Sequence, residues 1–191
     1  MPVTEDSPTN PTNPYGKTKL MVEQILSDIK NFHAISLRYF NPVGCYHPNL
    51  SEDLKLQIPG NLFPYITKVI KGELPHLNIF GGDWKTPDGT GIRDFIHIMD
   101  LATAHVAALE RLELYDHHKI YNIGTGIGYS ILDVIETFKK LGIEIPYNIT
   151  DKRPGDIGVC YSSPKLANDE LNWKATRTLL DMCKDTIHIS K

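Results

Sequence analysis

Hydrophobic residues recur along the chain at two spacings that alternate with each other. A spacing of three to four residues predicts helices, and short β-branched and aromatic runs predict strands. Predicted helices cover residues 15–30, 61–71, 100–112 and 130–142, and two more begin at Ser163-Pro164 and at Thr176. Predicted strands cover residues 33–40, 77–80, 93–98 and 119–123. Strands separated by helices of ten or more residues favour parallel pairing, so we predict an α/β fold.

Turn and capping residues support several of these boundaries. Ser130 with Asp133 is a helix-start signal, and Gly142 is a typical residue just after a helix end. The run from Gly81 to Gly91 is rich in glycine and aspartate, which predicts a turn-dense loop.

Composition and charge exclude several classes of protein. The chain has 191 residues, with 20 Lys and Arg against 23 Asp and Glu. This balance lacks the basic excess of a nucleic-acid-binding protein. No stretch approaches the ~20 apolar residues of a membrane span. The first residues show neither the basic start nor the apolar run of a secretory signal, so we expect a cytoplasmic protein. The remaining classes are proteins that act on a small molecule and proteins that bind another protein.

Cysteines and histidines give no pattern of metal ligands. Cys45, Cys160 and Cys183 lie far apart, and no C-x-x-C or H-x-x-x-H pair occurs. These spacings argue against both a disulfide framework and a zinc cage, so we predict no metal site.

The first chemical feature is Tyr15 with Lys19 at the head of the first predicted helix. A four-residue offset places the two side chains on one helix face. A tyrosine, which titrates near ~10, can act as a base near neutrality only if a nearby cation stabilises its phenolate. The alternative is a solvated lysine beside a half-buried tyrosine, and so short a pattern does not decide between them.

A second feature is the glycine-rich turn from Gly124 to Gly128, between a predicted strand and a predicted helix. Such a turn can hold a dinucleotide pyrophosphate on backbone N–H groups. The G-x-G-x-x-G pattern fails because position 129 is tyrosine. We therefore interpret this segment as a structural turn.

Arginines and aromatic residues form a third, scattered feature. Arginine suits bidentate binding of phosphate oxygens, and an aromatic ring can stack on a base. The candidates are Phe80, Arg93, Arg153 and Asp156. Taken singly, each residue is more often part of an ordinary surface.

The order of these motifs is more informative than any one of them. NPYGKTK, RYFNPVG, DGTGIRDFIH, YNIGTG and RPGD followed by DELNW resemble, in sequence and spacing, the C-terminal part of the UDP-glucose 4-epimerase family. That family belongs to the extended short-chain dehydrogenases/reductases. The resemblance runs over essentially the whole chain.

The resemblance implies an isomerase with NAD as cofactor and a UDP-sugar as substrate. Tyr15 resembles the base that takes the proton from the sugar 4-hydroxyl while hydride passes to NAD. Lys19 resembles the lysine that supports this tyrosine and binds the nicotinamide ribose. Phe40 falls where the family contacts the nicotinamide end.

The resemblance also implies a set of substrate contacts. The matching residues are Asn41, Asn61, Leu62, Asn78, Phe80, Arg93, Arg153, Asp156 and Cys160. Arg93 and Arg153 would clamp the diphosphate, and Phe80 would pack on uracil. Cys160 is small enough to leave room for an N-acetyl group, so UDP-GlcNAc and UDP-GalNAc are further candidate substrates.

The resemblance implies an incomplete Rossmann-like fold. Residues 1–45 would be a C-terminal remnant of the NAD-binding domain. Residues 46–191 would form mainly a small α/β UDP-sugar-binding domain, with about 92–124 returning to the Rossmann part. The glycine-rich NAD loop of the family is missing, so we expect the chain alone to bind NAD weakly and to be inactive.

Three alternatives follow. The chain is a fragment of an epimerase, a non-catalytic UDP-sugar-binding or partner-binding remnant, or a related dehydratase or decarboxylase. The motifs RYFNPVG and DGTGIRDFIH weigh against the third. The segment Ser51–Leu54 departs from the family pattern, which puts closure of the substrate loop in doubt. Family members commonly form homodimers through helices that include the one after Tyr15.

Overall fold

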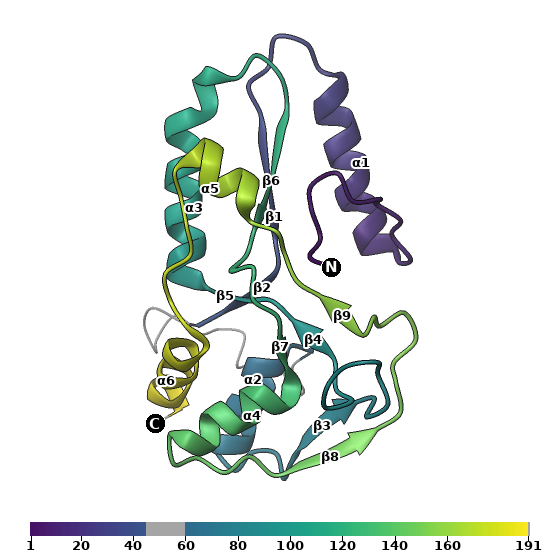
Figure 1. The fold of residues 1–191 in the computed structure, drawn as a ribbon, viewed down its shortest axis with the longest axis vertical. Helices are drawn as coiled ribbons and strands as arrows, with labels where there is room; N and C mark the ends of the chain where they lie inside the picture. Colours follow the sequence, from purple (N-terminus) through teal and green to yellow (C-terminus); the bar gives the residue numbers. More distant parts are fainter. Residues whose placement is uncertain (45–59, 191) are drawn as a thin grey trace.

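The computed structural model describes residues 1–44 and 60–190, so the loop around Ser51–Leu54 lies outside the described residues. Figure 1 shows the arrangement of the elements. The helices are α1 (Pro14–Asp28), α2 (Leu62–Ile70), α3 (Ile98–Arg111), α4 (Ile131–Lys140), α5 (Lys165–Leu171) and α6 (Leu179–Ser190), with a 3-10 turn η3 (Leu112–Leu114). The strands are β1 (Ile35–Tyr39), β2 (Asn41–Val43), β3 (Leu77–Phe80), β4 (Ile92–Arg93), β5 (Phe95–His97), β6 (Lys119–Ile123), β7 (Tyr129–Ser130), β8 (Tyr147–Thr150) and β9 (Val159–Cys160).

The described strands form small and mostly parallel sheets. β1 pairs with β6, β2 with β5, and β3 with β8, each in parallel. β4 lies between β9, to which it is parallel, and β7, to which it is antiparallel. Helices connect the parallel partners, as such pairing requires. The α/β prediction is confirmed.

Buried side chains gather in two clusters. One cluster lies among α2, α4, α6 and β3 and includes Ile66, Phe138 and Met182. The other lies among α3, α5 and β6 and includes Ala104 and Tyr121. In Figure 1 the first cluster belongs to the lower half of the molecule and the second to the upper half. The division of the chain into two domains stays a prediction.

The C-terminal segment ties the two halves together with buried polar groups. Asp100, at the start of α3, accepts hydrogen bonds from the backbone and hydroxyl of Thr176 and from the backbone and guanidinium of Arg177. His97 lies 2.8 Å, Nε2 to Oδ2, from Asp185 of α6. Because the buried side chains of Asp100 and His97 both have hydrogen-bond partners, their burial leaves no polar atom unpaired.

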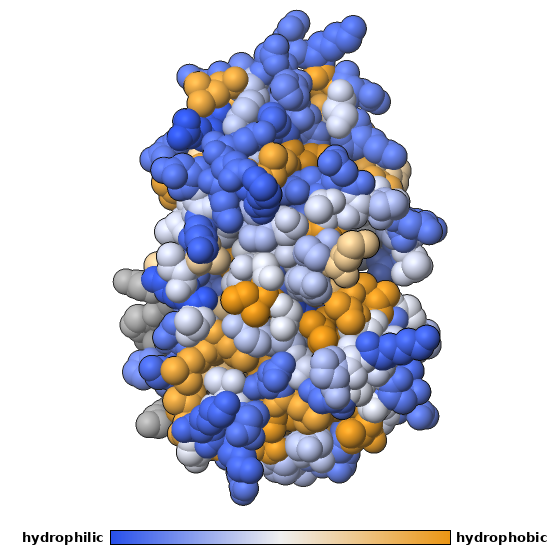
Figure 2. Space-filling model, viewed as in Figure 1, coloured by the Kyte–Doolittle hydropathy of each residue, from blue (hydrophilic) through white to orange (hydrophobic). Residues whose placement is uncertain are grey.

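Surface character differs between the halves. On the face shown in Figure 2, hydrophilic residues dominate the top and apolar patches gather in the lower half. Among the described helices, none combines the length and the apolar content that crossing a membrane requires.

Most predicted elements occur near their predicted positions, and two strands match at both ends. Those strands are β3 and β6. The helix after Ser130 has a complete capping box, and Gly142 follows it with φ of 80°. The pattern missed β2, β7, β8 and β9, which have two to four residues each, because runs this short seldom show an alternation. The four-residue strand β3 is the exception.

Two predicted boundaries are wrong, each at a place where the chain contacts distant segments. The strand predicted over 93–98 is divided at Asp94, and Ile98 already belongs to α3. The last helix begins at Leu179 rather than at Thr176. Thr176 and Arg177 bind Asp100, and Thr178 is the capping residue, because its carbonyl accepts the Met182 N–H. Thr178 and Asp181 then cap the helix through reciprocal backbone bonds of 2.9 and 3.3 Å.

Candidate functional site

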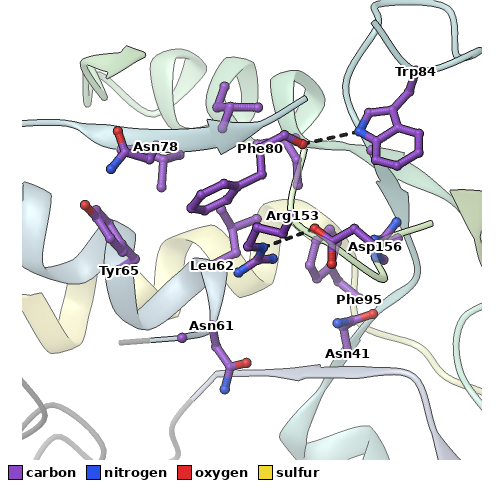
Figure 3. A pocket seen from close by; sticks show the side chains of 16 residues that line it. Asn41, Asn61, Leu62, Tyr65, Asn78, Phe80, Trp84, Phe95, Arg153 and Asp156 are labelled. Carbon is purple, nitrogen blue, oxygen red and sulfur yellow. Dashed lines mark hydrogen bonds and ion pairs between the residues drawn. The ribbon is translucent and has the colours of Figure 1, made fainter. Parts of the chain in front are cut away.

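A cavity of about 470 Å³ opens between the start of α2, strand β3 and the segment of residues 151–158. Eight of the residues named from the sequence line it (Figure 3). They are Asn41, Asn61, Leu62, Asn78, Phe80, Arg93, Arg153 and Asp156. These residues come from five separate stretches of the chain, so the fold brings them together.

Local structure explains how two of these elements present their side chains. Strand alternation buries Leu77 and Ile79 in the first cluster and leaves Asn78 and Phe80 on the other face. Asn61 is the N-cap of α2, and its side chain is not used for capping. Its amide therefore stays available at the cavity wall.

The polar end of the cavity is built from two arginines and a carboxylate. The Arg153 guanidinium lies over the Phe80 ring, with Cζ 4.3 Å from the ring centroid. Arg153 Nε donates to Asp156 Oδ2 at 3.1 Å, and Arg93 donates to the neighbouring carbonyl of Ile92 at 2.9 Å. This end can pair with an anion, and the Phe80 ring provides an aromatic surface beside it.

A second cavity of about 370 Å³ shares Asn41 and Arg93 with the first and is also lined by Phe40 and Cys160. The parallel register of β4 and β9 places Arg93 opposite Cys160. Burial raises the pKa of the Cys160 thiol, and the nearby Arg93 charge opposes this only in part. The thiol is therefore neutral at physiological pH and acts as a small, weakly polar wall.

Tyr15 and Lys19 lie on α1, outside the linings of both cavities. Lys19 Nζ is 5.2 Å from the centroid of the Tyr15 ring, so the two groups share a helix face as the spacing predicted. The Tyr15 side chain is 73% exposed. Asn13 caps this helix by accepting the Gly16 N–H at 2.8 Å.

Polar contacts attach α1 to the sheet. Arg38 of β1 forms a two-pronged ion pair with Glu23, at 2.8 and 2.7 Å. His118 contacts Ser27 of α1 and Ser36 of β1, and burial lowers the pKa of its imidazole. Apolar residues are exposed on α1 and at its C-terminal end, namely Met21, Val22, Ile25 and the C-cap residue Ile29. The expected homodimer stays a prediction, and these exposed apolar residues are the feature that bears on it.

The turn from Gly124 to Gly128 is held by a buried carboxylate. Asp94 accepts the backbone N–H groups of Thr125 and Gly126, at 2.9 and 3.0 Å. A Cβ at Gly124 would lie only 2.5 Å from Asp94 Oδ2. Because Asp94 occupies these amides, the geometry agrees with a structural turn.

Three residues of this region were missed in the sequence, namely Tyr65, Trp84 and Asp94. Asp94 had a visible signal, because a charged residue within an apolar strand run requires buried partners. The sequence carried no signal for Tyr65 or Trp84, since an aromatic residue in a helix or a glycine-rich loop can serve in the core, at the surface or in a binding site. Among the described residues, no group of three or more His, Cys, Asp or Glu side chains could hold a metal ion.

Residues 1–124 match the family described as "NAD dependent epimerase/dehydratase family". The chain belongs to this family. The cofactor of this family is NAD.

Individual relatives agree in sequence with the predicted resemblance. The chain is 51% identical to the UDP-glucose 4-epimerase of Pasteurella multocida (strain Pm70) over 197 residues, which cover 100% of this chain and 58% of the relative. It is 48% identical to the UDP-glucose 4-epimerase of Bacillus subtilis (strain 168), covering 97% and 56%. The chain thus spans less than two thirds of the length of these relatives, and the resemblance to the family is confirmed.

Solved structures agree in fold. The UDP-glucose 4-epimerase of Stenotrophomonas maltophila, with bound NAD and formylated UDP-arabinopyranose, superposes with a TM-score of 0.94 at 44% identity. The enzyme of Bifidobacterium longum, in complex with NAD+ and UDP, gives 0.92 at 46%. Each comparison covers 99% of this chain and 58% of the solved chain.

Proposed function

We propose that the eight named residues lining the first cavity form the UDP-sugar site of a UDP-glucose 4-epimerase. Tyr15 and Lys19 are the catalytic pair of that enzyme. The reaction is the interconversion of UDP-galactose and UDP-glucose. The observation that carries the proposal is the first cavity, which collects eight residues that the resemblance assigns to the nucleotide sugar. An anion-binding end beside an aromatic ring suits a uridine diphosphate.

Each group then has a task set by its chemistry. Arg93 and Arg153 neutralise the diphosphate, and the Phe80 ring packs on the uracil. Tyr15 removes the proton of the sugar 4-hydroxyl and returns a proton to it. Lys19, close to the Tyr15 ring, stabilises the phenolate that this exchange requires.

The residues present suit one end of NAD. Tyr15 and Lys19 offer a hydroxyl and an ammonium group to a ribose, and Phe40 offers a ring in the second cavity. When bound, NAD supplies a transient hydride acceptor. The Gly124–Gly128 amides bound to Asp94 are not available to a pyrophosphate. We therefore propose that these 191 residues retain UDP-sugar binding without holding NAD tightly.

Calorimetric titration of the purified chain tests this proposal. We expect UDP to bind, NAD to give no measurable heat, and UDP-galactose with added NAD to remain unconverted. Arg93→Ala should weaken UDP binding at least about tenfold, because a charge-assisted hydrogen bond contributes about 1.5–3 kcal/mol.

The matched control is Arg111→Ala at the end of α3, outside both cavity linings, which should leave the UDP affinity unchanged. A chain that binds NAD but not UDP would overturn the assignment. Conversion of UDP-galactose by the isolated chain with added NAD would overturn the proposal that these residues do not hold NAD tightly.

A second prediction concerns Cys160, which faces the second cavity next to Arg93. Cys160→Tyr fills space that an N-acetyl group would occupy, so binding of UDP-GlcNAc should fall at least tenfold relative to UDP-glucose. Such a loss follows from the cost of overpacking, about 1–3 kcal/mol. Titrations of both sugars measure the ratio. Cys160→Ser, which keeps the size, should preserve it, and an unchanged ratio in Cys160→Tyr would contradict the idea.

A further inference from the structure

Trp84 lies in the loop between β3 and β4, and neither the motifs nor the resemblance gave it a role. Its indole is half-buried and lines the first cavity (Figure 3). Indole Nε1 donates to the carbonyl of Phe80 at 3.2 Å. The Trp84 backbone N–H donates to the Gly89 carbonyl at 2.9 Å, which fixes the loop from within. The indole is therefore attached to the end of β3 that carries Phe80.

Two glycines make room for this indole. A Cβ at Gly81, where φ is +85°, would lie 2.4 Å from Trp84 Nε1. A Cβ at Gly158 would lie 2.8 Å from Trp84 Cε3. Both distances are shorter than real contacts, so glycine is required on each side. Gly158 lies at the far end of the segment that carries Arg153 and Asp156.

Trp84 also contacts the near end of that segment. Lys152 Nζ lies 4.5 Å from the centroid of the indole. The same ammonium group pairs with Asp83 Oδ1 at 2.7 Å, on the residue next to Trp84. The indole thus meets the segment of residues 151–158 at both ends, through Lys152 and through Gly158.

The segment joins β8 to β9, which are paired with β3 and β4, and the Ile92 N–H donates to the Gly158 carbonyl at 2.8 Å. Residues 151–158 lie outside helices and strands, and residues 151–155 are exposed. A turn in which the Asp156 N–H donates to the Arg153 carbonyl at 3.2 Å orders its middle. Strand pairing fixes the backbone where the segment begins and ends, and side-chain contacts such as those of the indole restrict the backbone states of the exposed residues between.

We propose that Trp84 is a positioning residue for the nucleotide-sugar site. It clamps both ends of residues 151–158 to the end of β3, so that Arg153 and Asp156 face the cavity beside Phe80. This inference rests on the proposed function, because it assumes that Arg153 contacts the diphosphate. Trp84 acts through Arg153 rather than by touching the reacting atoms.

The test compares UDP with uridine, which lacks the diphosphate, on the full chain. Trp84→Ala should weaken UDP binding about tenfold and uridine binding less than about threefold, because the released Arg153 must be ordered again on binding. Trp84→Phe retains a ring between the two glycines and should restore most of the UDP affinity. Adding Trp84→Ala to Arg153→Ala should cause no further loss, since the two residues act as one unit.

The outcomes separate the two proposals. If the unmodified chain does not bind UDP, the proposed function fails. If the unmodified chain binds UDP, three results would contradict the positioning role. Trp84→Ala could leave the UDP affinity unchanged, or it could lower the affinities for UDP and uridine by the same factor. In the double variant, Trp84→Ala could add its full loss of UDP affinity to that of Arg153→Ala. If Trp84→Ala does not fold, Lys152→Met removes the near-end contact and leaves the indole in place. It should then lower UDP affinity about threefold without affecting uridine, and no change in UDP affinity would overturn the role.

Discussion

Asp94→Ala is expected to lower the free energy of unfolding by about 3–5 kcal/mol, a large part of the 5–15 kcal/mol typical of a domain. Asp94 is fully buried, and its carboxylate accepts five hydrogen bonds from three residues, Thr125, Gly126 and Ser162. The substitution leaves these donors without a partner in a site from which water is excluded. Urea unfolding followed by circular dichroism measures the loss.

The matched control for Asp94 is Asp133, the carboxylate of the α4 capping box. Asp133→Ala also removes a carboxylate that binds a backbone N–H, but at the helix end, and should cost about 1 kcal/mol. A loss of stability below 1 kcal/mol for Asp94→Ala would show that Asp94 does not hold its own segment, the glycine-rich turn and Ser162 together. Because Asp94 lies next to Arg93 and across from the β9 end, its loss should also loosen both cavities.

Tyr15→Phe is expected to lower kcat by about 10²–10⁴ in an active form of the protein, because it removes the proposed general base. To obtain an active form, a chimera is made by fusing the part of the Pasteurella multocida relative that this chain does not match ahead of residue 1, where the resemblance implies the NAD-binding region. Conversion of UDP-galactose to UDP-glucose is the measurement. The phenylalanine keeps the ring beside Lys19, so the UDP affinity should be unchanged.

Tyr147→Phe is the control for that experiment, since Tyr147 is an exposed tyrosine of β8, far along the chain from α1. It should leave kcat within twofold of the unmodified chimera. A Tyr15→Phe chimera within tenfold of the unmodified rate would contradict the role of Tyr15. A folded, UDP-binding chimera without any activity would favour the alternative of a non-catalytic UDP-sugar-binding protein.

Eight residues named from the motifs line the first cavity, whereas the chemistry of single residues points to four of them, Phe80, Arg93, Arg153 and Asp156. Residue spacing alone placed Tyr15 and Lys19 on one helix face, and the structure agrees. The individual signals of Phe80 and Arg153 were weak, yet the two side chains lie in contact. They are 73 residues apart in the sequence, and no local periodicity encodes a contact over that separation.

The errors in the predicted elements have a common physical origin. Asp94 and Asp100 bind backbone N–H groups from segments 31 to 77 residues away. The partner of a strand likewise cannot be read from a window of neighbouring residues: β4 pairs with β9, whereas β5, which follows after one intervening residue, pairs with β2. The predicted strand over 93–98 is divided at Asp94 by this change of partner. The last helix starts after Thr178, whose carbonyl accepts the Met182 N–H, while Thr176 and Arg177 bind Asp100.

The sequence by itself determined the α/β class, the ends of β3 and β6, the shared helix face of Tyr15 and Lys19, and the membership of the family, because periodicity, capping and motif order are local or linear properties. The tertiary structure decided which of the scattered arginines and aromatic residues meet in one cavity. It also decided that the Trp84 indole lies against Lys152 and Gly158, and that the Asp94 carboxylate binds the backbone N–H groups of the glycine-rich turn. Those features depend on contacts between distant segments, which exist only once the two apolar clusters have packed.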